Sequence, residues 1–514
     1  MSLGRKAAIG AGWMLAWRMV ARSLRIGSTL ALARLLVPAD FGLVAMALTF
    51  EGAIQAFSTF PVYDALLRRP GDSTGLYDAA FTLQLGRALL NGIVVAAGAP
   101  LAAAWFGEPR LLHLLYALAV MTVVSGLDNI GLVDFQRQMR FDVQFKLQVL
   151  PSILTVIATI AVAAMTHSYW TLLIGLGVGR IGRISMGYMI HPYRPRLSLK
   201  GWQELAGFSF WLWLAGLATM AWTQLDSFLL GPAFGPAGLG LFLVALQLAE
   251  LPAIEILEPV TSVLFASFAH VQREGSRAGR NPLLIAMALV LLLAPIALVI
   301  SAAAADLVPL LLGSRWLAAI PLVTLAAWRV MLRPFQSVGA TALTARGWVR
   351  GNFLIVSVGA VLRAVVVVAA VATGSLPIVI VATIVALAAG AILYAVPFWP
   401  ELKAEGGGFL PCLWRFTIAL GVTSLLLAGL GLGWQPQPAV AALASVSVRV
   451  LGLLLHVAAI GSVAVLAYVA ALAGLWFACG KPNGPERMVL NLVQEFLPAK
   501  RVRTATARSL LRLR

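Results

Sequence analysis

Charge is scarce in this chain of 514 residues, because Asp, Glu, Lys and Arg make up only 11% of it. In a soluble protein, about a quarter of the residues are charged. The apolar residues instead gather in runs long enough for helices that cross a hydrocarbon core of about 30 Å. Together with a mean hydropathy of +0.92, these runs exclude a soluble domain and predict a polytopic membrane protein.

Several features of cofactor-dependent proteins are missing as well. The only cysteines, Cys412 and Cys479, lie on apolar segments and predict no disulfide framework. No G-x-x-x-x-G-K-[ST] phosphate loop is present, so we do not expect ATP to drive the protein. The histidines are scattered and form no metal-ligand cluster. We therefore predict no catalytic site, metal or cofactor, and the only small ligand left open is a coupling ion, H+ or Na+.

Fourteen apolar segments are predicted to cross the membrane as helices. They cover residues 9–33, 40–60, 76–104, 111–133, 145–166, 169–191, 207–230, 238–266, 282–304, 316–343, 351–373, 376–398, 409–433 and 445–478. Of the 38 basic residues, 24 then fall at the N-terminus, in the even-numbered connections or in the tail. Only Arg34, Arg110 and Arg315 fall on the opposite side. Because cytoplasmic loops collect Lys and Arg, both termini are predicted to be cytoplasmic.

The chain contains an internal repeat. "PADFGLVAMAL" begins at Pro38 and "PAGLGLFLVAL" begins at Pro236, 198 residues later, and each follows an odd-numbered span. We therefore expect an all-α membrane protein with two pseudo-symmetric six-helix lobes. The predicted parts are a first lobe (1–191), a cytoplasmic linker (192–206), a second lobe (207–398), a further linker (399–408), two C-terminal spans (409–478) and a cytoplasmic basic amphipathic tail (479–514).

The tail allows two interpretations. "ERMVLNLVQEFL" places apolar residues on one helical face and precedes the basic stretch "AKRVRTATARSLLRLR". This pattern is typical of an interfacial helix followed by a segment that anionic membrane lipids attract. A basic tail that only sets the orientation of the chain is the alternative.

The first span carries three arginines within "WMLAWRMVARSLRIGST" (13–29). At about 100° per residue, Arg18, Arg22, Arg25 and Thr29 share one helical face. Arginine at the bilayer centre costs at least about 2.5–3.5 kcal/mol, so this face requires water, opposite charges or an anionic ligand.

Two explanations of this face stand side by side and do not exclude each other. The arginines form an intramembrane ion-pair network, or they line a hydrated cavity that receives an anion. The candidate counter-charges are Glu51, Asp226, Glu250, Glu255 and Glu258. Arg87 and Asn91 would also line this cavity. They share a polar stripe of the third span with Gln84.

Further charges lie within the spans. Arg180, Arg183, Arg329, Arg333 and Arg363 add to the cationic character, whereas Arg415 and Arg449 lie near span ends, where we expect them to reach the membrane surface.

The eighth span reads "LAELPAIEILEPV", in which prolines interrupt the helix beside Glu250, Glu255 and Glu258. These acids could carry protons or cations, or could pair with the arginines.

Five segments together resemble the polysaccharide-flippase (Wzx-type) branch of the multidrug/oligosaccharidyl-lipid/polysaccharide (MOP) exporters. They are "LARLLVPADFGLVAMAL" (32–48), "DFQRQMRFD" (134–142), "LDSFLLGPAFGPAGLGLFLVALQLAELP" (225–252), "VTSVLFASFAHVQRE" (260–274) and "LVPLLLGSRWLAAIPLV" (307–323). Beyond residue 350 only hydropathy and the number of spans match.

This resemblance implies a flippase of the bacterial inner membrane. Such a protein moves undecaprenyl-diphosphate-linked oligosaccharides to the periplasmic leaflet by alternating access through a central cavity, for exopolysaccharide, capsule or O-antigen assembly. The resemblance assigns the diphosphate to the arginines of the first span, with polymerase or export machinery as partners. Nucleic acid is not expected as a partner.

Two rival functions follow from the same spans. A MATE-like drug or cation antiporter of the same superfamily would have a cavity rich in carboxylates, whereas arginines exceed acids here. A membrane polysaccharide polymerase or glycosyltransferase would need a large outward loop with catalytic residues, and the outward connections are short. We therefore predict a transporter and not an enzyme.

Overall fold

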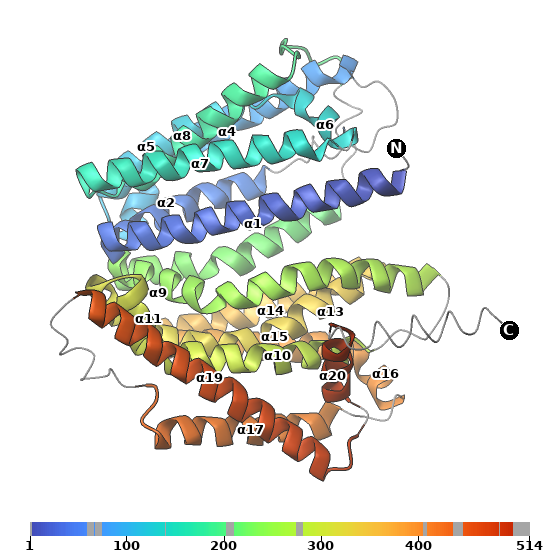
Figure 1. Ribbon diagram of the computed structural model, residues 1–514. Coiled ribbons are helices and arrows are strands. Elements are labelled where there is room, and N and C mark those ends of the chain that lie inside the picture. Colours follow the sequence, from blue (N-terminus) through green and yellow to red (C-terminus); the bar gives the residue numbers. More distant parts are fainter. Residues whose placement is uncertain are drawn as a thin grey trace. The chain divides into compact units, whose positions relative to one another are not determined.

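The computed structural model describes residues 3–58, 66, 74–138, 140–201, 210–273, 281–404, 409–434, 446–482 and 484–496. Within these ranges every regular element is a helix, so the all-α prediction is confirmed (Figure 1). The basic end of the predicted tail (497–514) and parts of both predicted linkers (202–206 and 405–408) lie outside the described residues.

The chain forms two compact units. Unit 1 comprises Met1–Leu243 and Leu311–Trp316, and unit 2 comprises Val244–Leu310 and Leu317–Arg514. The helices of unit 1 are α1 (Leu3–Leu35), α2 (Pro38–Phe57), α4 (Thr74–Phe106), α5 (Arg110–Ser125), η1 (Ile130–Leu132), α6 (Val133–Arg137), α7 (Phe141–Thr166), α8 (Trp170–Ile190) and the first part of α9 (Phe210–Arg273).

Unit 2 contains the remainder of α9 and all later helices except the short segment that joins unit 1. These helices are α10 (Pro282–Ala302), α11 (Ala304–Leu311), η3 (Ser314–Ala319), α12 (Ile320–Ala326), η4 (Ala327–Met331), α13 (Arg333–Ala345), α14 (Val349–Val371), α15 (Leu376–Ala395), η5 (Val396–Phe398), α16 (Trp399–Ala404), α17 (Phe409–Gly429), α19 (Val446–Ala478) and α20 (Pro485–Phe496).

Each unit is built from helices packed along one another. In unit 1, α1 lies along α7, α7 along α8, and α4 along α5, with α2 against both α4 and α5 (Figure 1). In unit 2, α10 is the central helix and contacts α12, η4, α13, α17, α19 and α20. Its sequence contains no charged residue, and a helix that is apolar all round is expected to be buried. The side chain of Asn281 caps it by accepting a hydrogen bond from the N–H of Leu283 at 2.9 Å.

Ten helices in the described residues are long and apolar enough to cross a membrane, or eleven if the bent pair formed by Arg110–Ser125 and Ile130–Arg137 is one span. A multi-pass membrane protein is thus confirmed. The predicted count of fourteen would further require α1 and α8 to cross and α9 to cross twice. It stays a prediction, as do the two six-helix lobes.

Three connections that the sequence predicts on one side of the membrane meet at one end of unit 1. The indole N–H of the buried Trp316 donates to the carbonyl of Ala33 at 2.7 Å, and Arg315 donates to the carbonyl of Leu35 at 3.1 Å. Asp40, at the start of α2, interacts electrostatically with Arg110 and Arg315. The connections after spans 1, 3 and 9 therefore share one end, as the predicted topology requires.

The two copies of the repeat motif contact each other within unit 1. A Cβ atom on Gly42 would lie 1.7 Å from the carbonyl oxygen of Pro236, and one on Gly240 would lie 1.9 Å from that of Pro38. Each glycine thus packs on the proline of the other copy, at the same offset in both directions. Gly235, with φ +65, kinks α9 just before this contact. The shared Pro and Gly of the motif are therefore explained by a close approach of two helix starts.

Substitution of Gly42 by alanine should destabilise this contact by about 1–3 kcal/mol, because the added methyl group has no space beside a backbone carbonyl. The thermal unfolding midpoint in detergent should fall accordingly. Gly52→Ala, on the same helix, is the control, because its nearest neighbour would be the Gln224 side chain at 3.8 Å. Equal midpoints for the two variants would contradict the role assigned to Gly42.

Candidate functional site

The predicted arginine line lies on α1, and its side chains differ in how far they are exposed. Arg18 and Arg25 are exposed, and Arg22 and Thr29 are partly buried. Since α1 packs along α7 in the same unit, the arginine face can be placed relative to that neighbour.

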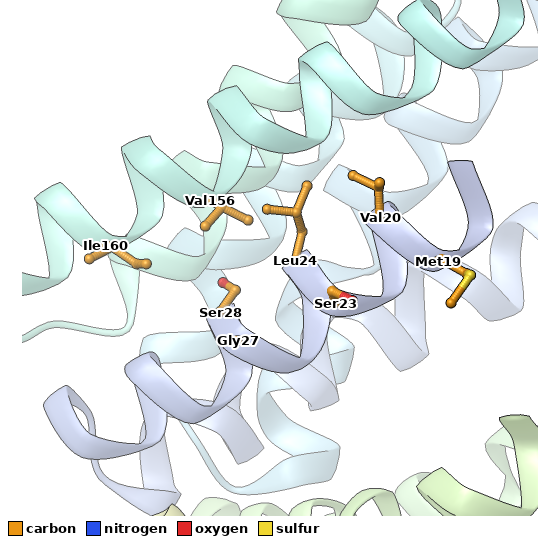
Figure 2. A pocket seen from close by; sticks show the side chains of 8 residues that line it. All are labelled: Met19, Val20, Ser23, Leu24, Gly27, Ser28, Val156 and Ile160. Carbon is orange, nitrogen blue, oxygen red and sulfur yellow. The ribbon is translucent and has the colours of Figure 1, made fainter. Parts of the chain in front are cut away.

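A shallow groove of about 430 Å³ separates α1 from α7 (Figure 2). It is lined by Met19, Val20, Ser23, Leu24, Gly27, Ser28, Val156 and Ile160. Figure 2 shows Val20 and Leu24 directed from α1 toward α7. At about 100° per residue, most of the groove residues of α1 lie on the side of the helix opposite to the arginine line, and Met19 and Ser28 lie at its two flanks. The arginines are therefore turned away from α7.

The polar stripe of α4 divides into bonded and unbonded residues. Asn91 is buried and donates to the hydroxyl of Ser58 at 2.7 Å, whereas Gln84 donates to the carbonyls of Gly126 and Asp128, both at 3.1 Å. Arg87 lies between these two residues in the sequence and is half-buried. It has no hydrogen bond or ion pair among the residues that the structure describes. Asn91 thus has a structural partner, and Arg87 is the member of the stripe able to hold an anion.

Glu51 is the centre of a hydrogen-bonded network in unit 1. Its carboxylate is buried and accepts from the hydroxyl of Thr122 at 2.5 Å and from the amide of Gln55 at 2.9 Å. Arg180 of α8 pairs with it at 3.5 Å. Next to this network, Arg183 pairs with Asp128 at 3.7 Å. These contacts join α2, α5 and α8.

Glu250 has the corresponding role in unit 2. Its buried carboxylate accepts from Nε of Arg329 at 2.8 Å and also pairs with Arg333. Arg329 is only 2% exposed and donates a second hydrogen bond to the hydroxyl of Thr383. One carboxylate thus fixes two guanidinium groups between α9, η4, α13 and α15.

The structure therefore brings together only some of the predicted site residues. Glu51 and Glu250 are paired with arginines of later spans, which the sequence marks as buried cations without assigning partners. Asp226 is buried on α9, while Glu255 and Glu258 lie exposed further along the same helix. Thr122 and Thr383 had no signal in the sequence, because threonine is common in apolar helices and only the fold reveals its bonding.

The C-terminal helices of unit 2 correct another expectation. Arg415 of α17 does not reach the surface: it is 2% exposed and pairs with the buried Glu486 of α20 at 2.6 Å. The prediction failed because the acid that pairs with Arg415 comes from the tail, 71 residues later. The amphipathic helix predicted at the start of the tail is present as α20 and packs on α10.

An apolar groove of about 530 Å³ runs along α13, α15 and α17 in unit 2. It is lined by Leu332, Phe335, Ala388, Ala391, Ile392, Ala395, Val396, Trp399, Pro400, Phe409 and Leu413. No charged side chain contributes to it. Such a surface suits a hydrocarbon chain and not a polar headgroup. In the described part of the chain, no group of three or more metal-ligating side chains is present.

The fold defines a multi-pass membrane protein whose helices are joined by buried pairs of charges. Its sequence matches the polysaccharide biosynthesis protein family over residues 31–321, more than half of the chain. The chain therefore belongs to this family.

Two relatives illustrate the match. The succinoglycan biosynthesis transport protein ExoT of Rhizobium meliloti (strain 1021) is 24% identical over 318 residues, which cover 62% of this chain and 64% of ExoT. The lipopolysaccharide biosynthesis protein WzxC of Escherichia coli (strain K12) is 23% identical over 361 residues, covering 69% of this chain and 73% of WzxC. The chain thus spans less than two thirds of the length of ExoT.

Solved structures show the same fold. The lipid II flippase MurJ in its inward closed conformation superposes with a TM-score of 0.67 at 12% identity, covering 90% of this chain and 99% of that one. An inward-facing MATE transporter of the MOP superfamily gives 0.55 at 14% identity, covering 75% and 96%. The fold is therefore that of the MOP transporters, and the resemblance found in the sequence is confirmed.

The Glu250 cluster yields a prediction of stability. Glu250→Gln removes the charge that compensates Arg329, and an uncompensated buried charge costs about 3–5 kcal/mol. We expect a large loss of thermal stability in detergent. The matched control is Glu108→Gln, which removes the partner of the half-exposed Arg110, a surface pair worth about 0–1 kcal/mol. If both variants unfold at the wild-type temperature, the buried cluster does not stabilise unit 2.

Proposed function

We propose that the protein is a flippase for undecaprenyl-diphosphate-linked oligosaccharides. It moves them from the cytoplasmic to the periplasmic leaflet of the bacterial inner membrane, for the assembly of exopolysaccharide, capsule or O-antigen. Membership of a polysaccharide biosynthesis family and the fold of MurJ support this proposal. ExoT, a relative named as a transport protein, supports transport over catalysis.

The observation that carries the proposal is the direction of the α1 arginine line. Arg18, Arg22 and Arg25 lie on the face of α1 that is turned away from α7. Their charges are therefore outside the interface between α1 and α7. Arginine binds phosphate oxygens through two parallel hydrogen bonds, and three arginines along about two helical turns are sufficient to neutralise a diphosphate.

The ion-pair explanation of this line loses two of its five candidate acids. Glu51 and Glu250 are held by Arg180 and by Arg329 with Arg333, respectively. Asp226, Glu255 and Glu258 stay as candidate counter-charges or coupling residues. Arg87 adds a further cation of unit 1 that a sugar-linked phosphate could engage, and we place it with Thr29 and Asn91 in the proposed binding cavity.

The lipid part of the substrate needs a different surface. A polyprenyl chain gains free energy from apolar contact, and the groove along α13, α15 and α17 offers such contact without a charged group. We propose that this groove guides the chain while the diphosphate follows the arginines.

Alternating access by two six-helix lobes would carry the headgroup across the membrane. An inside-negative membrane potential favours outward movement of an anion by about 2.3 kcal/mol per charge for each 100 mV. With both termini in the cytoplasm, the basic tail would lie against anionic lipids, and polymerase or export machinery would receive the product.

Flipping of a fluorescent undecaprenyl-diphosphate oligosaccharide in proteoliposomes tests the proposal. Arg22→Ala should slow flipping by about tenfold or more, because a hydrogen bond to a charged group is worth about 1.5–3 kcal/mol. Arg22→Lys should restore only part of the rate, since lysine keeps the charge but loses the two-pronged geometry. Ser23→Ala, on the groove side of the same helix, is the control and should flip at the wild-type rate.

Two results would contradict the proposal. Equal rates for wild type, Arg22→Ala and Arg22→Lys would make the arginine line structural. Export of cationic dyes by a wild-type protein that does not flip the lipid would establish the antiporter function instead.

A further inference from the structure

A pocket of about 340 Å³ lies in unit 2, where the chain passes from α13 to α14. It is lined by Leu343, Arg346, Gly347 and Trp348 from the end of α13 and the turn that follows, and by Pro397 and Phe398 of η5. This turn is the connection after the tenth predicted span, which the sequence predicts to be cytoplasmic. The volume is at the lower end of the range of about 300–1,000 Å³ for ligand pockets.

The turn has a backbone that fixes the position of Trp348. Gly347 has φ +78, a conformation that favours glycine. The N–H of Trp348 donates to the carbonyl of Leu343 at 2.9 Å, and the N–H of Gly347 donates to that of Thr344 at 3.0 Å. Two such bonds around a glycine are typical of a helix end, after which the next side chain contacts the last helical turn. The sequence "LTARGW" (343–348) therefore encodes a defined orientation of the chain at Trp348.

The indole of Trp348 is supported on one face. A Cβ atom on Gly351 of α14 would lie 2.7 Å from Cδ2 and 2.9 Å from Cε2 of this indole. These two atoms form the bond shared by the two rings, so such a close neighbour can only lie over a face of the ring system. Glycine is the residue that leaves room for this contact. Trp348 is nevertheless 54% exposed, which leaves a large part of the indole available to a ligand in the pocket.

The charged residue of the described lining is neutralised by a partner. Nη1 of Arg346 donates to Oε1 of Glu401 on α16 at 2.6 Å, and Nη2 donates to Oε2 at 3.0 Å. The guanidinium also lies over the ring of Phe398, with Cζ 4.9 Å from the ring centroid. This two-pronged pair has no net charge, while each group has more donors or acceptors than the pair itself uses. The pocket thus combines an aromatic platform with neutralised hydrogen-bonding groups.

This combination favours a sugar over other ligands. An anion would have to displace Glu401 from Arg346, and a hydrocarbon chain would remove water from the ion pair without replacing its hydrogen bonds. A sugar ring has C–H groups on its faces, which can pack on an aromatic side chain, and hydroxyl groups around its rim. Those hydroxyl groups can donate to the carboxylate and accept from the guanidinium.

The pocket adjoins the apolar groove of unit 2 through η5. Val396 and Trp399 line the groove, whereas Pro397 and Phe398, which lie between them in the chain, line the pocket. A molecule whose hydrocarbon chain occupies the groove can therefore place its polar end in the pocket. A lipid-linked sugar is a molecule of this kind.

We propose that this pocket binds a sugar of the lipid-linked oligosaccharide before the substrate crosses the membrane. Trp348 stacks on the sugar ring, and Arg346 and Glu401 bind its hydroxyl groups. The pocket thereby selects substrates by their glycan, whereas the arginine line of α1 receives the diphosphate that they share. The identity of the ligand rests on the proposed flippase function, but its binding can be measured without transport.

Binding is measured on the purified full chain in detergent with two fluorescent probes, an undecaprenyl-diphosphate oligosaccharide and undecaprenyl diphosphate without sugar. Wild type should bind the first probe more tightly. Trp348→Ala should bind the first probe about tenfold more weakly, because the aromatic platform is lost, and should bind the second as wild type does. Trp348→Phe should recover part of the affinity. Trp105→Ala, at an exposed tryptophan of unit 1, is the control and should bind both probes normally.

The ion pair is tested with the same two probes. Glu401→Gln leaves the guanidinium of Arg346 without a neutralising carboxylate, which favours an anion over a neutral sugar. The preference of this variant for the sugar-bearing probe should therefore fall several-fold. Glu108→Gln is the matched control, because Glu108 forms a similar two-pronged pair with Arg110 in unit 1. It should keep the preference of wild type.

Three results would overturn the proposal. They are equal affinities of wild type for the two probes, an unchanged affinity of Trp348→Ala for the oligosaccharide probe, and an equal loss of affinity for both probes. The last result would make Trp348 a contact of lipid headgroups instead. The flipping assay is independent of these measurements. Wild type that binds the oligosaccharide through Trp348 but does not flip it would contradict the flippase function and leave the sugar pocket in place.

Discussion

A carboxylate or guanidinium that leaves water for the interior of a membrane protein needs an opposite charge, because unpaired burial costs several kcal/mol. This constraint organises both units. Glu51 joins three helices of unit 1 through Thr122 and Arg180, and Glu250 fixes Arg329 and Arg333 in unit 2. A helix that is apolar on nearly all sides has no strongly preferred face for packing. The paired charges therefore help to decide which face each helix turns toward its neighbours.

The arginine line of α1 differs from these buried, paired charges. Buried acids of both units are already paired with arginines of later helices, while Arg18 and Arg25 stand exposed on the face of α1 that is turned away from α7. The cationic stripe of unit 1 and the apolar groove of unit 2 are the two surfaces that the proposed substrate, with its diphosphate headgroup and hydrocarbon tail, would require. Membership of the polysaccharide biosynthesis protein family supports this proposal.

The helical fold and the repeat could be predicted from the sequence, because apolar runs and the motif shared by Pro38 and Pro236 are local signals. The positions of Arg18, Arg22, Arg25 and Thr29 on one face followed from helical periodicity alone. The partners of the buried charges could not be predicted in this way. Glu486 reaches Arg415 across 71 residues and Asp306 reaches His456 across 150, and only the packing of the helices decides such pairings.

The central claim is that the arginine face of α1 borders water and receives a diphosphate. The most direct test is thiol labelling of Arg25→Cys and Leu24→Cys, each combined with Cys479→Ser to remove the exposed native thiol. A charged, membrane-impermeant reagent reacts only with a hydrated thiolate. We expect Arg25→Cys to react, with protection by an undecaprenyl-diphosphate oligosaccharide, and Leu24→Cys to stay unlabelled. Failure of Arg25→Cys to react, or labelling that the lipid leaves unchanged, would contradict the account.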